Sequence, residues 1–141
     1  MSLNKNNFLG GIEMSKVECG NWNDIPFQEN RPGVKRKVFA MESDSMMGSV
    51  NELHFGHSKW PHSHPHEQIS VILQGVCDFY VNDVPHRMTA GSWIFVPPNA
   101  EHYSICLDEN VPVVNMDVFS PPRKEYVEAF KQFLEEAKAD K

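Results

Sequence analysis

Short runs of β-branched and aromatic residues, separated by turn-forming residues, dominate the sequence between residues 34 and 119. Alternating apolar and polar positions over a few residues are typical of strands with one buried face. Gly, Asn, Asp and Pro stand between the runs, as at Gln74-Gly75, and favour tight turns. Many short strands with such punctuation indicate a β-sandwich or barrel. The predicted strands cover residues 34–40, 46–55, 69–73, 77–81, 86–89, 92–96, 102–107 and 111–119.

The pattern changes after Pro121-Pro122, where apolar residues recur at helical spacing over residues 125–137. Pro122 suits the start of a helix. The apolar face, opposite Lys and Glu, consists of Tyr126, Val127, Phe130, Phe133 and Leu134. We therefore expect a partly flexible N-terminal extension over residues 1–33 and a barrel over 34–122. A helix over 123–141 would cover the barrel or a neighbouring subunit.

Composition narrows the class of protein. A chain of 141 residues that is 40% hydrophobic suffices for one compact core. A formal charge of −6 and a pI near 5.6 argue against nucleic acid and anionic membranes as partners. Three scattered cysteines are too few for a disulfide framework. With no apolar stretch of membrane-spanning length and no visible signal peptide, we expect a cytoplasmic protein.

Two histidine-containing segments carry the candidate chemistry. The first, Trp60-Pro-His-Ser-His-Pro-His-Glu-Gln68, places His62 and His64 two residues apart. Side chains at i and i+2 of an extended segment point the same way, so these histidines can supply adjacent metal ligands. His102 follows about one hairpin later and is best placed to be the third. Three further histidines lack such spacing, and we expect them at the surface: His54, His57 and His86.

These segments resemble the two sequence motifs of the cupin superfamily. The first motif has Gly, five residues, His-x-His, three or four residues, a carboxylate, six residues and Gly. It falls here on Gly56, His62, His64, Gln68 and Gly75. The second has Gly, five residues, Pro-x-Gly, two residues, His, three residues and Asn. It falls here on Gly91, Pro97, Asn99, His102 and Cys106. The resemblance implies an all-β double-stranded β-helix, a jelly-roll barrel, with a C-terminal α-helix.

Three positions depart from the cupin pattern. Gln68 replaces the acidic ligand, Asn99 replaces a glycine and Cys106 replaces an asparagine. Asn tolerates a left-handed backbone, so Asn99 can keep the turn. The neutral Gln68 matters more, since it either binds the metal directly or hydrogen-bonds to its ligands.

The last predicted strand carries a second polar cluster. Val113, Asn115, Asp117 and Phe119 are expected to share one face, because alternate residues of a strand do. If that face points into the barrel, it forms a polar interior, which is costly unless it binds something. The alternative is that Asp117 faces solvent, as most carboxylates do.

The segment Asp117-Val-Phe119-Ser-Pro-Pro-Arg123, together with the first histidine motif, resembles the KdgF-type cupins of pectin and alginate breakdown. The resemblance extends from about residue 34 to residue 126. It implies one divalent transition metal (Ni, Zn, Fe, Mn or Co) and a cavity lined by Asp117, Phe119 and Arg123. The metal ligands that it implies are His62, His64, Gln68 and His102.

The residue chemistry fits such an activity. Three neutral imidazoles and a neutral amide leave a divalent ion its full charge, which favours a Lewis-acid site for anionic oxygen ligands. Arg123 can pair with a carboxylate, Asp117 can move a proton and Phe119 can pack on a sugar ring. The resemblance implies the reaction: a metal-dependent lyase or isomerase that opens 4,5-unsaturated monouronates into linear keto acids.

Other functions share this pattern. Related cupins include metal-dependent dioxygenases, the isomerase of bacilysin synthesis and non-catalytic cupins that bind sugar acids. Gln68, Asp117 and Arg123 favour the uronate reaction. As partners we expect a small anionic sugar acid and, because of an exposed sheet edge and apolar outer faces, a second copy of the chain in a homodimer.

Overall fold

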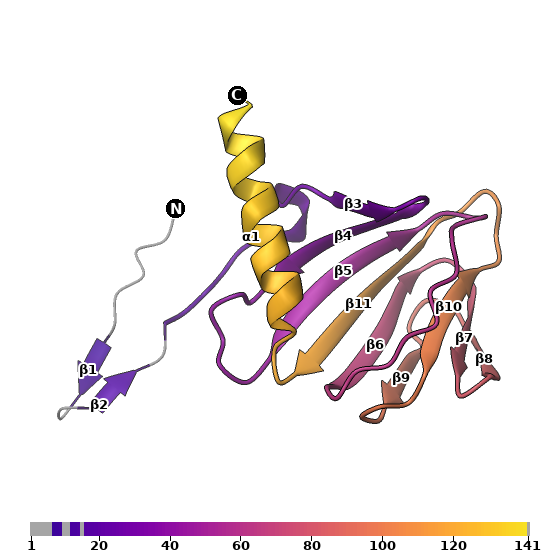
Figure 1. The fold of residues 1–141 in the computed structure, drawn as a ribbon, viewed down its shortest axis with the longest axis horizontal. Coiled ribbons are helices and arrows are strands. Elements are labelled where there is room, and N and C mark those ends of the chain that lie inside the picture. The colour runs from indigo at the N-terminus through magenta and orange to yellow at the C-terminus, as the bar shows by residue number, and fades with distance from the viewer. Residues whose placement is uncertain (1–6, 10–11, 15, 141) are drawn as a thin grey trace.

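The computed structural model describes residues 7–9, 12–14 and 16–140. This part of the chain forms eleven β-strands, a short 3-10 helix, η1 (Trp22–Asp24), and one α-helix, α1 (Lys124–Ala139) (Figure 1). The partly flexible extension expected over residues 1–33 falls in part outside the described residues, at 1–6, 10–11 and 15. The strands are β1 (Asn7–Leu9), β2 (Ile12–Met14), β3 (Gln28–Arg31), β4 (Val34–Phe39), β5 (Met47–Leu53), β6 (Glu67–Gln74), β7 (Cys77–Val81), β8 (Val84–Met88), β9 (Trp93–Val96), β10 (His102–Cys106) and β11 (Val113–Ser120).

The strands form two facing antiparallel sheets beside a small β1–β2 pair. The larger sheet has the order β3-β4-β5-β11-β6-β9, and the smaller has the order β10-β7-β8 (Figure 1). Strand β11 is central, since it pairs with both β5 and β6. This arrangement confirms the predicted jelly roll with its C-terminal helix, and each of the eight predicted strands lies within two residues of an observed one at each end.

The interior changes from apolar to polar along the central strands. Val113 of β11 belongs to the core between the sheets, with Leu53 and Ile72. Further along the same face, Asn115 and Asp117 face Asn51 and Ser70. Alternate residues of β11 thus share one face, as predicted. That face points inward, so the alternative that Asp117 faces solvent is wrong. The hydrogen bonds of the neighbouring strands offset the cost of this polar layer.

Helix α1 packs against the far end of this interior. Val127 and Phe130 are buried against Val38, Met47 and Phe119. The helix confirms the predicted periodicity, and its apolar face covers the barrel of its own chain (Figure 1). Its first turn stands at the edge of the polar layer, so residues at its start can line a site.

The larger sheet begins before the expected boundary at residue 34, because β3 pairs with β4. The segment preceding β3 is also attached to the sheet. The buried ammonium of Lys37 donates hydrogen bonds to the backbone carbonyls of Trp22 (2.6 Å) and Ile25 (3.4 Å). Local pattern did not reveal β3, since its alternation is short and polar.

Candidate metal centre and substrate cavity

The three histidines predicted to bind metal lie together. His62 and His64 belong to the loop before β6, and His102 opens β10. Two backbone hydrogen bonds join His62 to His102, at 3.2 and 2.9 Å. The backbone N–H of Asn99 donates to the carbonyl of His64 at 2.8 Å, from the left-handed turn expected there (φ 67°). The ring nitrogens of His62, His64 and His102 that can bind a metal lie within 4.8 Å of one another.

Backbone carbonyls orient all three rings. Each Nδ1 lies near one carbonyl oxygen: that of Trp60 for His62 (2.7 Å), of His66 for His64 (3.1 Å) and of Ala100 for His102 (2.8 Å). A carbonyl only accepts, so each Nδ1 must carry the proton, and each Nε2 of a neutral ring presents a lone pair. Such outer hydrogen bonds are usual for metal-binding histidines.

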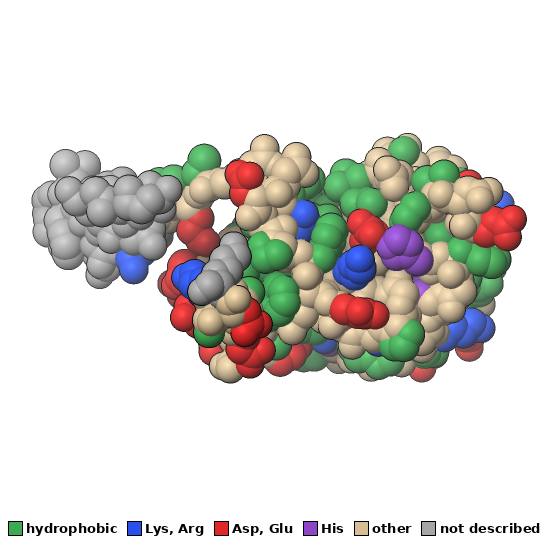
Figure 2. All heavy atoms as spheres, turned by 90° about the horizontal axis from the view of Figure 1, so that it is seen from above, with side chains coloured by type: hydrophobic (Ala, Val, Ile, Leu, Met, Phe, Trp, Pro, Cys, Tyr) green, Lys and Arg blue, Asp and Glu red, His purple; other side chains and the backbone are tan. Residues whose placement is uncertain are grey.

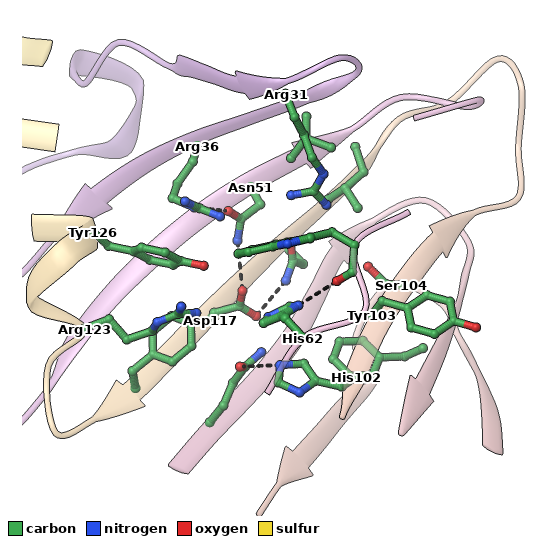
Figure 3. Close-up of a pocket in the computed structure, with 17 residues that line it drawn as sticks. Arg31, Arg36, Asn51, His62, His102, Tyr103, Ser104, Asp117, Arg123 and Tyr126 are labelled. Atoms are coloured by element: carbon green, nitrogen blue, oxygen red, sulfur yellow. Dashed lines mark hydrogen bonds between the residues drawn. The ribbon is translucent and has the colours of Figure 1, made fainter. Parts of the chain in front are cut away.

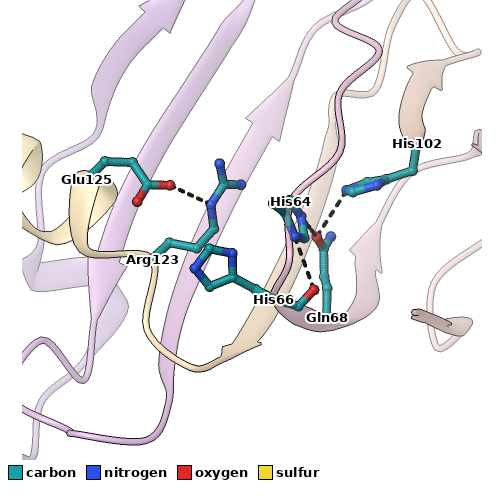
Figure 4. Close-up of polar contacts among 6 residues, drawn as sticks. All are labelled: His64, His66, Gln68, His102, Arg123 and Glu125. Carbon is teal, nitrogen blue, oxygen red and sulfur yellow. Dashed lines mark hydrogen bonds and ion pairs between the residues drawn. The ribbon is translucent and has the colours of Figure 1, made fainter. Parts of the chain in front are cut away.

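Gln68 turns its amide oxygen toward these lone pairs. Its Oε1 lies 3.0 Å from Nε2 of His64 and 3.1 Å from Nε2 of His102 (Figure 4). Its Nε2 donates to Ser70 Oγ at 2.9 Å, and Ser70 donates in turn to Asp117 Oδ1. The amide oxygen of Gln68 and the Nε2 atoms of His64 and His102 are therefore all acceptors, and no proton lies between them. A cation resolves that conflict, so the donor set fits a divalent metal.

Burial keeps these imidazoles neutral. Desolvation is the main cause that lowers the pKa of His62 to about 4, and it also lowers the pKa of His64 and His102. Nearby Arg123 lowers all three pKa values further. Neutral imidazole is the form that binds metals, so the site is ready for a metal at neutral pH.

A cavity of about 520 Å³, including its open mouth, adjoins this cluster (Figure 3). Its lining includes His62, His102 and Gln68. It also includes all three residues predicted for catalysis: Asp117, Phe119 and Arg123.

Asp117 accepts three hydrogen bonds in the cavity wall. Ser70 and Asn115 donate to Oδ1, the latter at 2.8 Å, and Asn51 donates to Oδ2 at 3.0 Å. Burial raises the pKa of Asp117, although the bond from Ser70 and the charges of Arg36 and Arg123 oppose the rise. A carboxyl group with a raised pKa suits proton transfer near neutral pH.

Arg123 precedes the first residue of α1 and is buried beside the cavity. Its Nε donates to Glu125 at 2.9 Å, while its buried Nη1 has no partner among the described residues (Figure 4). The guanidinium stacks 3.8 Å over the Tyr126 ring and lies 5.3 Å from the ring centre of Phe119. Arg123 therefore starts the helix and also lines the site.

Phe119 is buried between the histidine cluster and helix α1. Its ring meets His64 edge-on, with centroids 5.6 Å apart, and Tyr126 at 5.9 Å. It can hold His64 in place as well as contact a bound sugar.

Several cavity residues, among them one tryptophan, one tyrosine and two arginines, were not predicted from the sequence. Trp60 lines the cavity and stacks on His62, with ring centroids 4.2 Å apart. Tyr126, counted only as part of the apolar helix face, also lines the cavity. Arg31 and Arg36 complete the wall. The position of Arg36 could have been noticed in the sequence. It shares a strand face with Val34 and Val38, where an apolar residue is expected.

His57 corrects the expectation that it lies at the surface. It is buried, its Nδ1 donates to the carbonyl of Ser58 (2.9 Å), and its Nε2 accepts from the backbone N–H of Cys106 (3.1 Å). It attaches the loop after β5 to β10, which carries His102. His54, in contrast, is half-exposed beside Glu52, and His86 is exposed.

Comparison with known proteins relates the chain to the cupins. The profile of the cupin domain family matches residues 50–119, which hold all four candidate ligands. The pectin degradation protein KdgF of Dickeya dadantii (strain 3937) is 29% identical over 107 residues, covering 74% of this chain and 93% of that protein.

Two solved structures share the fold. KdgF from Halomonas sp. has a TM-score of 0.73 at 23% identity, covering 79% of this chain and 99% of that one. An RmlC-like cupin from Shewanella frigidimarina NCIMB 400 has a TM-score of 0.69 at 25% identity, covering 79% and 96%. Among the described residues, the one α-helix is neither long nor apolar enough to cross a membrane.

Proposed function

We propose that this chain, which is a small cupin resembling KdgF, converts 4,5-unsaturated monouronates from pectin or alginate into linear keto acids. One observation carries the proposal. The histidine cluster and the neutral Gln68 adjoin the same cavity as Arg123, whose buried Nη1 has no partner in the described part of the chain. A cation site and a free guanidinium N–H beside one cavity suit a small anionic sugar.

Arg123 and Phe119 would orient the substrate. A uronate carboxylate can accept from the unpartnered N–H of Arg123, in a charge-assisted hydrogen bond. Phe119, beside both His64 and Arg123, offers an apolar edge to the sugar carbons. A bound divalent metal would act as a Lewis acid that polarises substrate oxygens. Its ligands would be His62, His64, His102 and Gln68.

The reaction is an isomerisation. The proton of the C1 hydroxyl is lost, the bond between C1 and the ring oxygen breaks, and C1 becomes an aldehyde. The ring oxygen becomes an enol oxygen at C5, and a proton delivered to C4 gives the C5 ketone. Asp117 is the candidate group for moving that proton, since it lines the cavity and its pKa is raised. The atoms balance without any other reactant.

Loss of the absorbance of the unsaturated uronate tests the proposal. We expect wild-type protein of measured metal content to accelerate this loss with galacturonate-derived or alginate-derived monouronates. No acceleration with either substrate, at full metal content, would overturn the uronate assignment. Oxygen uptake that depends on Fe(II) would favour the dioxygenase alternative instead.

Substitution of the substrate-orienting arginine sharpens this test. Arg123→Ala should raise KM roughly tenfold to a hundredfold, the worth of a hydrogen bond to a charged group. Arg87→Ala is the matched control, because Arg87 is an exposed arginine paired with Asp78 on the smaller sheet. Equal effects of the two substitutions would contradict the role given to Arg123.

A further inference from the structure

The side chains that line the cavity include more positive than negative charges. Three of its lining residues are arginines, Arg31, Arg36 and Arg123, and its one lining carboxylate is Asp117. The chain as a whole carries a formal charge of −6, and acidic side chains gather around the C-terminal end of α1 in the face seen in Figure 2. The arginines are therefore a local feature of the cavity and do not follow from overall composition.

Arg31 lies across the cavity from Arg123. It ends β3, and its guanidinium carbon lies 5.2 Å from the ring centre of Trp60. Figure 3 shows Arg31 and Arg123 on opposite sides of the cavity, with Asn51 and Asp117 between them. The Nε of Arg31 is buried and has no hydrogen-bond partner among the described residues, as is true of Nη1 of Arg123.

Arg36 stands between these two arginines. Its Nε donates to Asn51 at 3.2 Å, and its guanidinium stacks 3.8 Å over the ring of Tyr126. Arg123 lies at the same distance from that ring, and Figure 3 shows Tyr126 between the two. The ring of Tyr126 thus separates the guanidinium of Arg123, next to the histidine cluster, from the guanidinium groups of Arg36 and Arg31.

Among the described residues, the pair formed by Arg31 and Arg36 has no carboxylate in direct contact, although the charges of Asp117 and Glu125 act on Arg36 from farther away. In the described part of the chain neither residue forms a salt bridge, and the charge of Arg36 lowers the pKa of Arg31. Two close guanidinium groups repel each other, and a buried N–H without an acceptor is costly. An anionic group of a ligand would relieve both costs, whereas a neutral hydroxyl would relieve only the second.

We propose that the cavity takes sugar acids with an acidic group at each end, one at Arg123 and the other at Arg31 and Arg36. The position of the first group rests on the proposed function. The second group is a carboxylate or a phosphate ester, since guanidinium binds both. Under this assignment a sugar acid that carries a second acidic substituent binds more tightly than a simple monouronate.

Two matched pairs of ligands test the second anionic group by calorimetry on the protein as purified. Galactarate differs from galacturonate by a second terminal carboxylate, and 6-phosphogluconate differs from gluconate by a terminal phosphate. We expect the doubly acidic member of at least one pair to bind about tenfold or more tightly. The pair with the larger gain identifies the kind of acidic group. Equal affinities within both pairs would overturn the proposal.

Substitutions then assign that gain to Arg31. Arg31→Gln should abolish the gain and leave binding of galacturonate and gluconate within about twofold, because those ligands reach Arg123 alone. Lys35→Gln is the matched control, since Lys35 carries the same charge on the exposed side of β4. A gain that survives in Arg31→Gln, or that is lost equally in Lys35→Gln, would also overturn the proposal.

These binding measurements are independent of catalysis. A protein that fails to open unsaturated uronates yet prefers galactarate or 6-phosphogluconate refutes the proposed function alone. A protein that opens them but shows no preference refutes the second acidic group alone. Circular dichroism of each variant, matched to wild type, shows that any loss of the preference does not come from unfolding.

Discussion

At the scale of single residues, the site depends on the orientation of one amide. Gln68 donates to Ser70, and Ser70 donates to Asp117, so the amide oxygen must face the histidines. Each hydrogen bond in this series determines whether the next group acts as donor or as acceptor. Asp117 therefore lines the cavity and also helps to orient the amide of Gln68 toward the histidine cluster, through Ser70.

Loss of one histidine should weaken metal binding. We expect His62→Ala to bind a divalent metal at least about tenfold more weakly, since it removes one of the proposed ligands. Metal analysis after dialysis measures the effect. His86→Ala, at an exposed position on β8, should keep wild-type content. Unchanged metal in His62→Ala would rule out the site.

Replacing Asp117 separates its two roles. Asp117→Asn should slow uronate conversion by about 10²–10⁴, the usual contribution of a proton-transfer group, and leave the metal in place. Rates and metal content are measured on the same samples. If metal is lost together with the rate, Asp117 acts through Ser70 and Gln68; if the variant is fully active, the proton-transfer role is wrong.

At the scale of elements, the site depends on how loops are attached to strands. The loop carrying His62 and His64 is hydrogen-bonded to the start of β10 at His102. The loop after β5 is held to the end of the same strand by the bond from Cys106 to His57. Strand β10 thus positions both loops. Protonation of His57 can loosen the loop after β5.

His57 should make stability depend on pH. Burial is the main cause that lowers its pKa below the usual 6.5. As pH falls below 6.5, the unfolded chain takes up a proton that the folded chain resists, so this contribution to stability is complete above pH 6.5 and lost below it. Protonation would also place a hydrogen on Nε2, where Cys106 donates.

Urea unfolding of the metal-free protein tests this effect. His57→Gln does not titrate, so its deficit against wild type, about 1 kcal/mol for a lost buried hydrogen bond, should shrink between pH 7.5 and pH 5. His86→Gln should show no such trend, since His86 is exposed. A deficit that stays constant with pH would contradict the coupling.

At the scale of the whole molecule, one outer sheet face is apolar. Ile69 pairs with Phe95 across β6 and β9, and both are nearly half exposed. Trp93, which pairs with Val71, is 71% exposed at the edge strand of the larger sheet. Such a contiguous face is a candidate interface, and a twofold dimer would cover it and the edge together.

We propose that a homodimer forms through this face. Trp93→Glu should shift the mass measured by light scattering from dimer to monomer, because it places a charge in the apolar contact. Val84→Glu is the matched control, at an exposed apolar position on β8 in the other sheet. A wild-type protein that is monomeric at all concentrations would refute the dimer, and a dimer unaffected by Trp93→Glu would refute this face.

The sequence by itself determined the strands of residues 34–120, the helix and the residue types that can bind a metal. Local alternation defines which residues of β11 share a face, and the spacing of His62 and His64 brings them to one side of the chain. These features depend on neighbours within a few residues, so local reasoning could reach them. The expectation for Asp117 remained open at that stage, because no local signal says which face of a strand is buried.

Only the tertiary structure decided what surrounds those residues. The chain from Gln68 to Ser70 to Asp117 depends on the register of β6 against β11, where Ser70 pairs with Asp117. The burial of His57 depends on its contact with β10, and the cavity arginines come from β3, β4 and the start of α1. Hydrogen bonding and charge repulsion act over a few ångströms of space whatever the separation in sequence, so such contacts follow from the packing of distant elements and leave little trace in local pattern.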